Sequence, residues 1–337
     1  MKLLLTGGAG YIGTHTSLEL LNKDHELTIV DNLSNSSPIA LDRIRHLSNR
    51  NFAFHEVDLL DRPGLEKVFR STAFDAVIHF AGLKAVGESV ARPLAYYRNN
   101  IEGTLNLCEA MIGQNVKQMI FSSSATVYGE PERIPLDESC KVVDATNPYG
   151  RSKLFIERIL ADLCVAQPDM RIISLRYFNP VGAHQSGEIG EDPNDIPNNL
   201  LPFITQVAVG KLKELVVFGN DYPTPDGTCI RDYIHVNDLA SGHVAALQAL
   251  TNMQGHHVFN LGTGRGVSVL QMIETFEQVN QIKIPYRIGP RRPGDIPVSY
   301  TDPAYARKVL GWEATHSLDD ICRDAWRWQS KNPLGYR

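Results

Sequence analysis

Three residues of this 337-residue chain have the types and spacing needed to move a proton to or from a hydroxyl group. Tyr149 and Lys153 are four residues apart, so on a helix they lie one turn apart on the same face. A neighbouring ammonium favours the phenolate form and lowers the pKa of a tyrosine from its usual value of about 10. Ser124 adds a hydroxyl that can bind the same substrate oxygen. We predict a catalytic group of Ser124, Tyr149 and Lys153, with the phenol as the base.

The flanking sequence predicts the elements that position these residues. Pro148 suits the first position of a helix, and Asn147 is a good cap before it. Ser124 follows the apolar segment 118–121, which predicts a strand. Surface helices also produce Tyr-x-x-x-Lys by chance, so the functional interpretation depends on whether the chain also builds a nicotinamide site.

The N-terminus has the pattern of a dinucleotide site. A strand predicted at Lys2–Thr6 leads into glycines 7, 8, 10 and 13, and a helical pattern follows to about Leu21. Such glycines permit a tight turn and close approach of the backbone to a pyrophosphate, which the helix N-terminus attracts. A second predicted strand, 27–30, ends at Asp31, where a carboxylate accepts hydrogen bonds from ribose hydroxyls and repels a 2′-phosphate. This favours NAD over NADP, although a turn aspartate with no such role is the alternative.

The alternation of strands and helices predicts the fold class. Further strands are expected at 52–57, 74–80, 117–122 and 171–176, with a helix opening at Pro93 and passing Asn99. Apolar strands separated by helices indicate an α/β protein with a Rossmann-type, doubly wound parallel sheet. Ligands of such sheets bind at the carboxyl ends of the strands, where Asp31, Asp58 and Ser124 fall.

The second half of the chain has a different texture. Residues 180–230 are rich in Pro, Gly, Asn and Asp, with a helix expected near 202–210 and a strand near 215–218. Later helices are expected at 237–252, 268–280, 303–310 and 317–330, the second of them with a Ser268/Gln271 capping box. We expect an NAD-binding domain over 1–180, with 231–262 packing back onto it, and a smaller α/β substrate-binding domain over 181–337.

Composition restricts the partners. The net charge of −5 is spread without blocks, which argues against nucleic-acid binding. The five cysteines form no Cys-x-x-Cys motif, so we expect reduced thiols in a cytoplasmic protein, without a metal site or disulfide. His256 and His257 are read as structural. No apolar run approaches the length of about 18 residues that spans a membrane.

Several motifs together closely resemble the UDP-hexose 4-epimerases of the extended short-chain dehydrogenase/reductase family, over essentially the whole chain. The motifs are Gly7–Gly13, His79–Ser89, Ser122–Gly129, Tyr149–Lys153, Arg176–Ala183, Ile196–Leu200, Phe218–Tyr222, Arg231–Val236 and Trp326–Gln329.

The resemblance implies reversible C4 epimerisation of UDP-glucose and UDP-galactose through a transient 4-keto sugar, with tightly bound NAD and a homodimeric assembly. By resemblance, Tyr149 takes the proton of the sugar 4-hydroxyl, Lys153 hydrogen-bonds the nicotinamide ribose and Ser124 orients the hydroxyl. The expected cofactor-binding residues are Gly7, Gly10, Tyr11, Ile12, Gly13, Asp31, Asn32, Asn35, Ser36, Asp58, Leu59, Phe80, Ala81, Gly82, Lys84, Asn99, Ser122, Tyr177 and Phe178. The expected contacts of the UDP-sugar are Asn179, Asn199, Leu200, Val216, Phe218, Arg231, Arg292 and Ser299.

Two expectations for the substrate side have open alternatives. Arg231 and Arg292 are candidates to bind the diphosphate, because guanidinium groups pair bidentately with phosphate oxygens, but the sequence alone favours surface salt bridges. Ser299 stands where family members restricted to glucose and galactose have a bulky aromatic residue, so activity on UDP-GlcNAc and UDP-GalNAc is also expected. Tyr300 could fill that space instead.

Other reactions on the same fold remain alternatives. A sugar-nucleotide dehydratase needs an acidic pair after the position of Ser124, and Ala125 and Thr126 stand there instead. A net dehydrogenase would release NADH. A cofactor-sensing protein without catalysis would not need Ser124, Tyr149 and Lys153 together.

Overall fold

The computed structural model describes residues 1–192, 197, 199–292 and 294–337. Ile196 and Asn198 of the Ile196–Leu200 motif lie outside the described residues. The contacts divide the chain into two compact units. The first comprises Met1–Gly129, Lys141–Arg176 and Ala240–Phe259, and the second comprises Glu130–Cys140, Tyr177–Leu239 and Asn260–Arg337.

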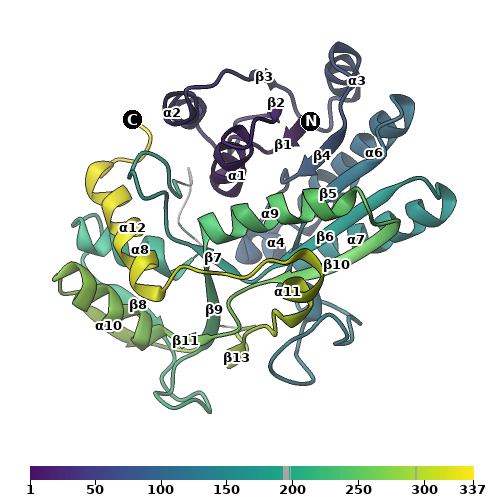
Figure 1. Ribbon diagram of the computed structural model, residues 1–337. Helices are drawn as coiled ribbons and strands as arrows, with labels where there is room; N and C mark the ends of the chain where they lie inside the picture. Colours follow the sequence, from purple (N-terminus) through teal and green to yellow (C-terminus); the bar gives the residue numbers. More distant parts are fainter. Residues whose placement is uncertain (193–196, 198, 293) are drawn as a thin grey trace. The chain divides into compact units, whose positions relative to one another are not determined.

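The first unit is built on a seven-stranded sheet with flanking helices, whose strands run in the order β10-β6-β5-β4-β1-β2-β3 (Figure 1). Its strands are β1 (Lys2–Thr6), β2 (Glu26–Asp31), β3 (Ala53–Glu56), β4 (Ala76–His79), β5 (Gln118–Ser124), β6 (Arg171–Tyr177) and β10 (Gly255–Leu261). Its helices are α1 (Tyr11–Leu21), α2 (Pro38–Ser48), α3 (Arg62–Ser71), α4 (Val86–Ala91), α5 (Pro93–Tyr97), α6 (Gly103–Gly113) and α7 (Pro148–Ala166), with a π-helical turn at Arg98–Glu102 and a 3₁₀ turn at Ala125–Tyr128. Helix α9 (Val236–Leu250) continues into this unit from the second.

The strand order confirms the expected doubly wound sheet. Strand β1 pairs in parallel with both β2 and β4, so the order of the chain reverses on the two sides of β1. Such a reversal is where sheets of this class bind ligands, beyond the carboxyl ends of the strands. The ends of β1, β2, β4 and β5 therefore define the place to look for a site.

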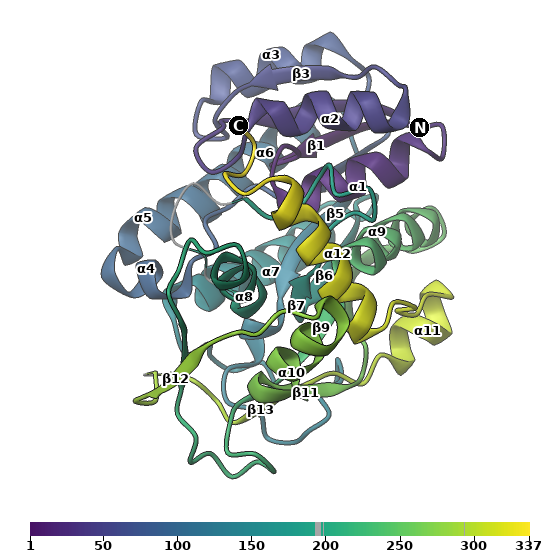
Figure 2. The ribbon, with the colours of Figure 1, turned by 90° about the vertical axis from the view of Figure 1, so that its left-hand side faces the viewer.

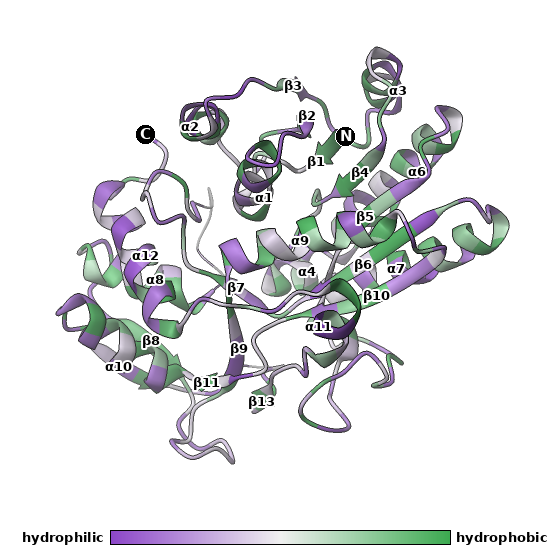
Figure 3. Ribbon diagram, in the orientation of Figure 1, coloured by the Kyte–Doolittle hydropathy of each residue, from purple (hydrophilic) through white to green (hydrophobic). Residues whose placement is uncertain are grey.

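Apolar side chains explain why these segments became buried strands. Leu3, Leu4 and Leu5 of β1 are fully buried, as are Ile78 of β4 and Ile120 of β5. Figure 3 shows β1 and β4 in the hydrophobic colour, whereas the helices alternate between the two colours. Helices with one apolar stripe cover a sheet that is apolar on both faces, as parallel sheets require.

The long helix expected to open at Pro93 is interrupted. Helix α5 ends at Tyr97, and a π-helical turn over Arg98–Glu102 precedes α6. Such a turn carries one extra residue per turn, so it rotates the side chains that follow and is frequent at functional sites. Here it presents Asn100, whose amide oxygen accepts a hydrogen bond from the Leu83 nitrogen at 2.8 Å and from the Asn99 side chain at 3.0 Å.

The second unit has smaller sheets and its own core. Its strands are β7 (Asn179–Val181), β8 (Leu215–Phe218), β9 (Ile230–His235), β11 (Gly266–Ser268), β12 (Tyr286–Gly289) and β13 (Val298–Ser299). Its helices are α8 (Leu200–Ala208), α10 (Val269–Asn280), α11 (Ala304–Leu310) and α12 (Leu318–Lys331), and α12 packs against α8 and α10 (Figure 2). The expected Ser268/Gln271 capping box is confirmed at the start of α10.

The two units are not separated by a single boundary at residue 180, because two segments belong to the unit on the other side of that boundary. Residues 130–140 belong to the second unit, because Leu136 bonds through its nitrogen to the Tyr300 carbonyl at 2.9 Å and through its carbonyl to the Asn260 side chain at 3.2 Å. The segment that returns to the first unit begins at Ala240, within α9, because β10 must pair at the edge of the large sheet.

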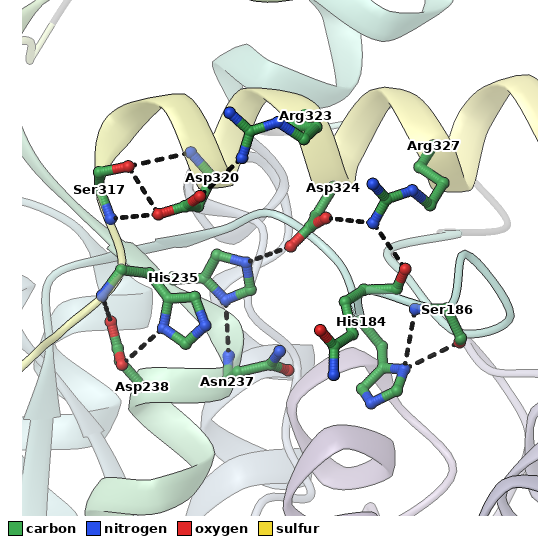
Figure 4. A network of polar contacts seen from close by, with 12 residues as sticks. His184, Ser186, His235, Asn237, Asp238, Ser317, Asp320, Arg323, Asp324 and Arg327 are labelled. Carbon is green, nitrogen blue, oxygen red and sulfur yellow. Dashed lines mark hydrogen bonds and ion pairs between the residues drawn. The ribbon is translucent and has the colours of Figure 1, made fainter.

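A polar network in the second unit joins the start of α9 to α12 and the loop before it (Figure 4). The Asp238 carboxylate accepts hydrogen bonds from the backbone nitrogen of His316 at 2.9 Å and from its Nδ1 at 2.8 Å. The His316 ring stacks on His235, with 4.2 Å between ring centroids. Asp324 faces His235 Nε2 at 3.4 Å and pairs with Arg327 at 2.8 Å.

Candidate active site

The predicted catalytic helix begins as the sequence indicates. Asn147 is the cap residue of α7, and its side-chain oxygen accepts a hydrogen bond from the Gly150 nitrogen at 2.9 Å. Pro148 occupies the first helical position. Tyr149 and Lys153 are thereby fixed one turn apart at the N-terminal end of α7.

Ser124 is the last residue of β5, and its side chain meets Tyr149 by a hydrogen bond. The Ser124 hydroxyl also accepts hydrogen bonds from the Thr126 nitrogen at 3.2 Å and from the Thr126 hydroxyl at 2.9 Å. These bonds cap the 3₁₀ turn that follows the strand and hold the serine side chain in one orientation. The structure thus brings Ser124 and Tyr149 together.

Lys153 is buried and is held in place by contacts with strand β5. Its ammonium donates to the Ser122 carbonyl at 2.7 Å and lies 4.8 Å from the centroid of the Phe121 ring. Burial lowers the pKa of Lys153 to about 8, and the negative charge of Glu157 opposes this shift. Lys153 in turn adds to the effect of burial on His79, whose pKa is lowered to about 3.

The electrostatics of Tyr149 differ from the expectation that Lys153 makes the phenol acidic. Burial raises the pKa of Tyr149, while the hydrogen bond with Ser124 and the positive charge of Lys84 lower it. The Lys153 ammonium, one turn along α7, donates its hydrogen bond to the Ser122 carbonyl. Lys84, which follows β4, is thus a cation whose charge favours the phenolate, and sequence spacing could not reveal its influence on Tyr149.

The glycines after β1 leave no room for side chains. Gly7 has φ of +70°, and a Cβ on it would lie 2.5 Å from the Ala81 nitrogen in the loop after β4. A Cβ on Gly13 would lie 2.5 Å from the Gly7 oxygen. Gly10 caps α1 without any side-chain hydrogen bond. This backbone cradle at the N-terminus of a helix fits a pyrophosphate.

Asp31 ends β2 beside that cradle. Its carboxylate accepts hydrogen bonds from the nitrogens of Ala9 at 3.0 Å and Leu33 at 2.9 Å, and from the Ser36 hydroxyl at 2.9 Å. The bonds fix the carboxylate between the glycine turn and the loop after β2, where the ribose of a dinucleotide lies in this fold. The side chains present therefore fit a dinucleotide.

The other predicted cofactor residues of the first unit lie on the loops at the same strand ends. Asp58 accepts from the side chain of Asn32 at 2.7 Å and from the Leu60 nitrogen at 2.8 Å. Phe80 packs on His243 with 4.9 Å between ring centroids. A Cβ added at Gly82 would lie 3.2 Å from the side-chain oxygen of Asn100 and 3.8 Å from the Lys153 ammonium. Tyr11 and Ile12 begin α1, and Asn35 and Ser36 lie in the loop after β2. Leu59 and Ala81 lie in the loops after β3 and β4, Asn99 lies in the π-helical turn, and Ser122 lies in β5. Tyr177 and Phe178, at the end of β6, belong to the second unit.

In the second unit, the two predicted arginines converge on one carboxylate. Arg292 pairs bidentately with Asp295 at 2.8 and 3.1 Å, and Arg231 reaches the same carboxylate at 3.8 Å. The Arg292 guanidinium lies 5.8 Å from the centroid of the Phe218 ring. Asp295 is a residue that the sequence reasoning missed, and its spacing of three residues from Arg292 was the available signal.

The remaining substrate candidates lie on elements of the same unit. Ser299 of β13 pairs in register with Arg231 of β9. Asn179 begins β7, which also pairs with β9, while Val216 and Phe218 lie on β8. Asn199 caps α8, whose first residue is Leu200, and its side chain donates to Glu191 at 3.3 Å.

The candidates read as structural have ordinary partners. His256 meets the Ser174 hydroxyl at 2.8 Å and His257 meets the Gln254 carbonyl at 2.8 Å. All five cysteines are unpaired and buried. Among the residues that the structure describes, no group of His, Cys, Asp or Glu side chains could hold a metal ion. In that part of the chain, no helix is long and apolar enough to cross a membrane.

A doubly wound sheet, a glycine cradle with an aspartate after β2, and a Ser–Tyr pair beside two lysines together define a dinucleotide-dependent enzyme acting on a hydroxyl or carbonyl group. Comparison with known families gives the particular family. A model of the NAD dependent epimerase/dehydratase family matches residues 3–262, and the chain belongs to this family.

Individual relatives cover the full chain. The UDP-glucose 4-epimerase of Bacillus subtilis (strain 168) is 58% identical over 337 residues, which is 100% of this chain and 99% of that protein. The crystal structure of UDP-glucose 4-epimerase from Bifidobacterium longum in complex with NAD+ and UDP has a TM-score of 0.97 and 53% identity, covering 99% of this chain and 100% of that one. The enzyme from Stenotrophomonas maltophila, crystallised with NAD and formylated UDP-arabinopyranose, has a TM-score of 0.96 and 49% identity, with 99% of each chain covered.

Proposed function

We propose that this protein is an NAD-dependent isomerase that interconverts UDP-glucose and UDP-galactose by inverting the configuration at C4. The observation that carries the proposal is the hydrogen-bonded pair of Ser124 and Tyr149, set beside the charge of Lys84 in the unit that contains the glycine cradle. Full-length similarity to UDP-glucose 4-epimerases supports it.

The residues of the chain account for the proton transfer. Tyr149 takes the proton from the 4-hydroxyl and returns it when the 4-keto sugar is reduced on its other face. Ser124 orients that hydroxyl, and the positive charge of Lys84 favours the phenolate between the two transfers. Lys153 is the residue that would hydrogen-bond the nicotinamide ribose, and its charge beside the site would favour the phenolate as well. When bound, NAD+ supplies the reversible oxidation at C4 that the side chains cannot perform.

The binding sets follow the two units. The first unit is proposed as the NAD-binding domain, with Gly7, Gly10 and Gly13 at the pyrophosphate and Asp31 at the ribose. The second is proposed as the UDP-sugar-binding domain. There, Arg231 and Arg292 would exchange Asp295 for the diphosphate, because a phosphate offers the same bidentate acceptor geometry.

The test is a Tyr149→Phe variant beside the parent protein. We expect the parent, purified and assayed without added cofactor, to convert UDP-galactose to UDP-glucose. The variant should retain NAD but lose activity by a factor of roughly 10² or more, because only the proton acceptor is removed. Full activity of the variant would refute the assigned base, and accumulation of NADH or of a dehydrated sugar in the parent would refute epimerisation.

We further propose that the acetylated sugars UDP-GlcNAc and UDP-GalNAc are also substrates. Ser299 is small, and the ring of the neighbouring Tyr300 packs beside Gly266, where an added Cβ would lie 3.1 Å from it. Ser299→Tyr should abolish activity on the acetylated sugars and spare the plain ones, with Ser299→Ala as the matched control that spares both. Equal loss on both substrate classes in Ser299→Tyr would contradict this.

We also propose a homodimer in the cytoplasm. Leu94 is 81% exposed and Val90 64% exposed on the neighbouring helices α5 and α4, and Phe155 is exposed on α7, which packs against both. Apolar side chains grouped on adjacent helices favour association with a second copy. Five unpaired thiols suit a reducing compartment. Sedimentation at micromolar concentration tests the dimer, and cell fractionation tests the location.

A further inference from the structure

One turn after Lys153, the same face of α7 carries a buried carboxylate, that of Glu157. Glu157 is four residues after Lys153, so Tyr149, Lys153 and Glu157 occupy three successive turns of the same face. The exposed fraction of Glu157 is 4%, and it is the next charged group on the helix that faces Lys153. The proposed reaction uses the first two residues and leaves the third unexplained.

Glu157 is held from two neighbouring strands. Its carboxylate accepts hydrogen bonds from Arg176 of β6, with Nε to Oε1 at 3.0 Å and Nη2 to Oε2 at 2.6 Å. The Ser123 hydroxyl of β5 donates to Oε1 at 2.5 Å. Arg176 also lies 4.7 Å from the centroid of the Tyr128 ring, in the 3₁₀ turn that follows Ser124. The carboxylate is therefore fixed in place and tied through Ser123 to the strand that carries Ser124.

The three consecutive serines of β5 match the three residues of α7. Ser124 bonds Tyr149, the Ser122 carbonyl bonds Lys153, and the Ser123 hydroxyl bonds Glu157. A buried ion pair by itself is weak support for stability, because burying the two charges costs about as much as their attraction returns. Its placement one helical turn after the buried ammonium of Lys153, which donates to the Ser122 carbonyl, suggests a different role.

We propose that Glu157, balanced by Arg176, is a positioning residue of the reaction that keeps Lys153 protonated where its ammonium bonds the Ser122 carbonyl. This inference rests on the proposed epimerisation. Glu157 acts through Lys153 and touches neither substrate nor cofactor. The positive charge of Arg176 partly cancels the effect of Glu157 on Lys153. The pair therefore determines the pH at which Lys153 loses its proton, and this pH is the upper limit of catalysis.

Several other charged or titratable groups face this cluster. His79 of β4 stays neutral beside Lys153 because burial and that lysine lower its pKa to about 3. His256 of β10 lies near Glu157 and Arg176, and burial first, then Arg176, lowers its pKa to about 4. Tyr96 of α5 and Lys84 face Tyr149 rather than Lys153, and Tyr96 is hydrogen-bonded to Glu88 of α4. Glu157 is therefore the group that opposes the fall of the Lys153 pKa.

The test is the pH dependence of kcat/KM for UDP-galactose in the holoenzyme. In Glu157→Gln, the remaining charge of Arg176 should move the basic limb of the profile down by about one pH unit. With the Lys153 pKa falling from about 8, the rate should drop roughly fivefold at about pH 8 and hardly change at about pH 6. In Arg176→Met, the unbalanced carboxylate should move the same limb upward. The double variant should return it close to the parent, and Glu157→Asp, which keeps the charge, should leave it in place.

A second measurement reads Lys153 without catalysis. In protein with ¹³C-labelled lysine, the Lys153 signal is assigned by its loss in Lys153→Met, and its titration should shift in the same directions as the basic limb. Parallel loss of rate at every pH, an unmoved limb in both folded single variants, or shifts of the same sign in both would overturn the proposal. If one single variant does not fold, the direction of the pH shift in the other single variant, together with the shift in the double variant, still tests the proposal. Failure of the parent to epimerise would instead refute the proposed function and leave the lysine titration as the measure of this inference.

Discussion

A methyl group added at Gly13 should destabilise the protein and expel the cofactor. The Cβ of Gly13→Ala would lie 2.5 Å from the Gly7 oxygen and 2.7 Å from the Gly8 α-carbon. Both are backbone atoms of the tight turn, so no side-chain rotation relieves the overlap. Overpacking of this kind costs about 1–3 kcal/mol, and a glycine-to-alanine change within a helix returns up to about 1 kcal/mol. We expect a net loss of about 1–2 kcal/mol in the free energy of unfolding.

Gly113→Ala is the matched control. Gly113 is also helical, at the end of α6, and a Cβ on it would meet nothing within 4 Å. It should gain about 0.5–1 kcal/mol. Urea unfolding of both variants after removal of NAD measures the free energy, and the NAD released per chain on denaturation measures the cofactor. The reasoning is refuted if Gly13→Ala unfolds at the same urea concentration as the control and retains a full complement of NAD.

Three further perturbations test other parts of the structure. Asn147→Ala should cost about 1 kcal/mol of stability and lower kcat, because the Gly150 nitrogen loses its cap, whereas Asn147→Asp should retain both. The hydrogen bond that His316 donates to the Asp238 carboxylate raises the pKa of His316. The pair therefore stabilises the fold fully below the pKa of the unfolded state and loses that contribution as the pH rises through the pKa of the folded state. His316→Gln should therefore lower the urea midpoint more at about pH 5.5 than at about pH 9, and an equal loss at both would argue against the pairing. Leu94→Glu should shift the sedimentation profile from dimer to monomer, and an unchanged profile would exclude α5 from the interface.

The sequence predicted the large sheet well because its signals are local. Apolar strands, the capping residue Asn147 and the glycine turn each act within a few residues, and the structure has the strands and the helix that these three signals predicted. Strands β9 and β12 were not predicted, and neither were the short strands β7, β11 and β13. The short strands have two or three residues each and exist because they pair with β9, a long-range contact that leaves no periodic pattern.

The candidate site was predicted less evenly. Residue types and spacing identified Ser124, Tyr149 and Lys153, but not the direction of the Lys153 ammonium, which is set by the Ser122 carbonyl of a different element. The influence of Lys84 on Tyr149 depends on where the loop after β4 ends, and the role of Asp295 depends on a bridge between β9 and a loop. Distances between residues of different elements come from tertiary packing, so they could not be predicted from the spacing of residues in a single sequence.

The burial of all five thiols makes the protein a convenient host for chemical labels. Burial raises the pKa of Cys108 and Cys322 to about 12 each, which suppresses the reactive thiolate at neutral pH. A cysteine introduced at Val165, which is 82% exposed at the end of α7, would react with a maleimide dye while the native thiols remain intact. One fluorophore per chain could thus be attached without first deleting any natural residue.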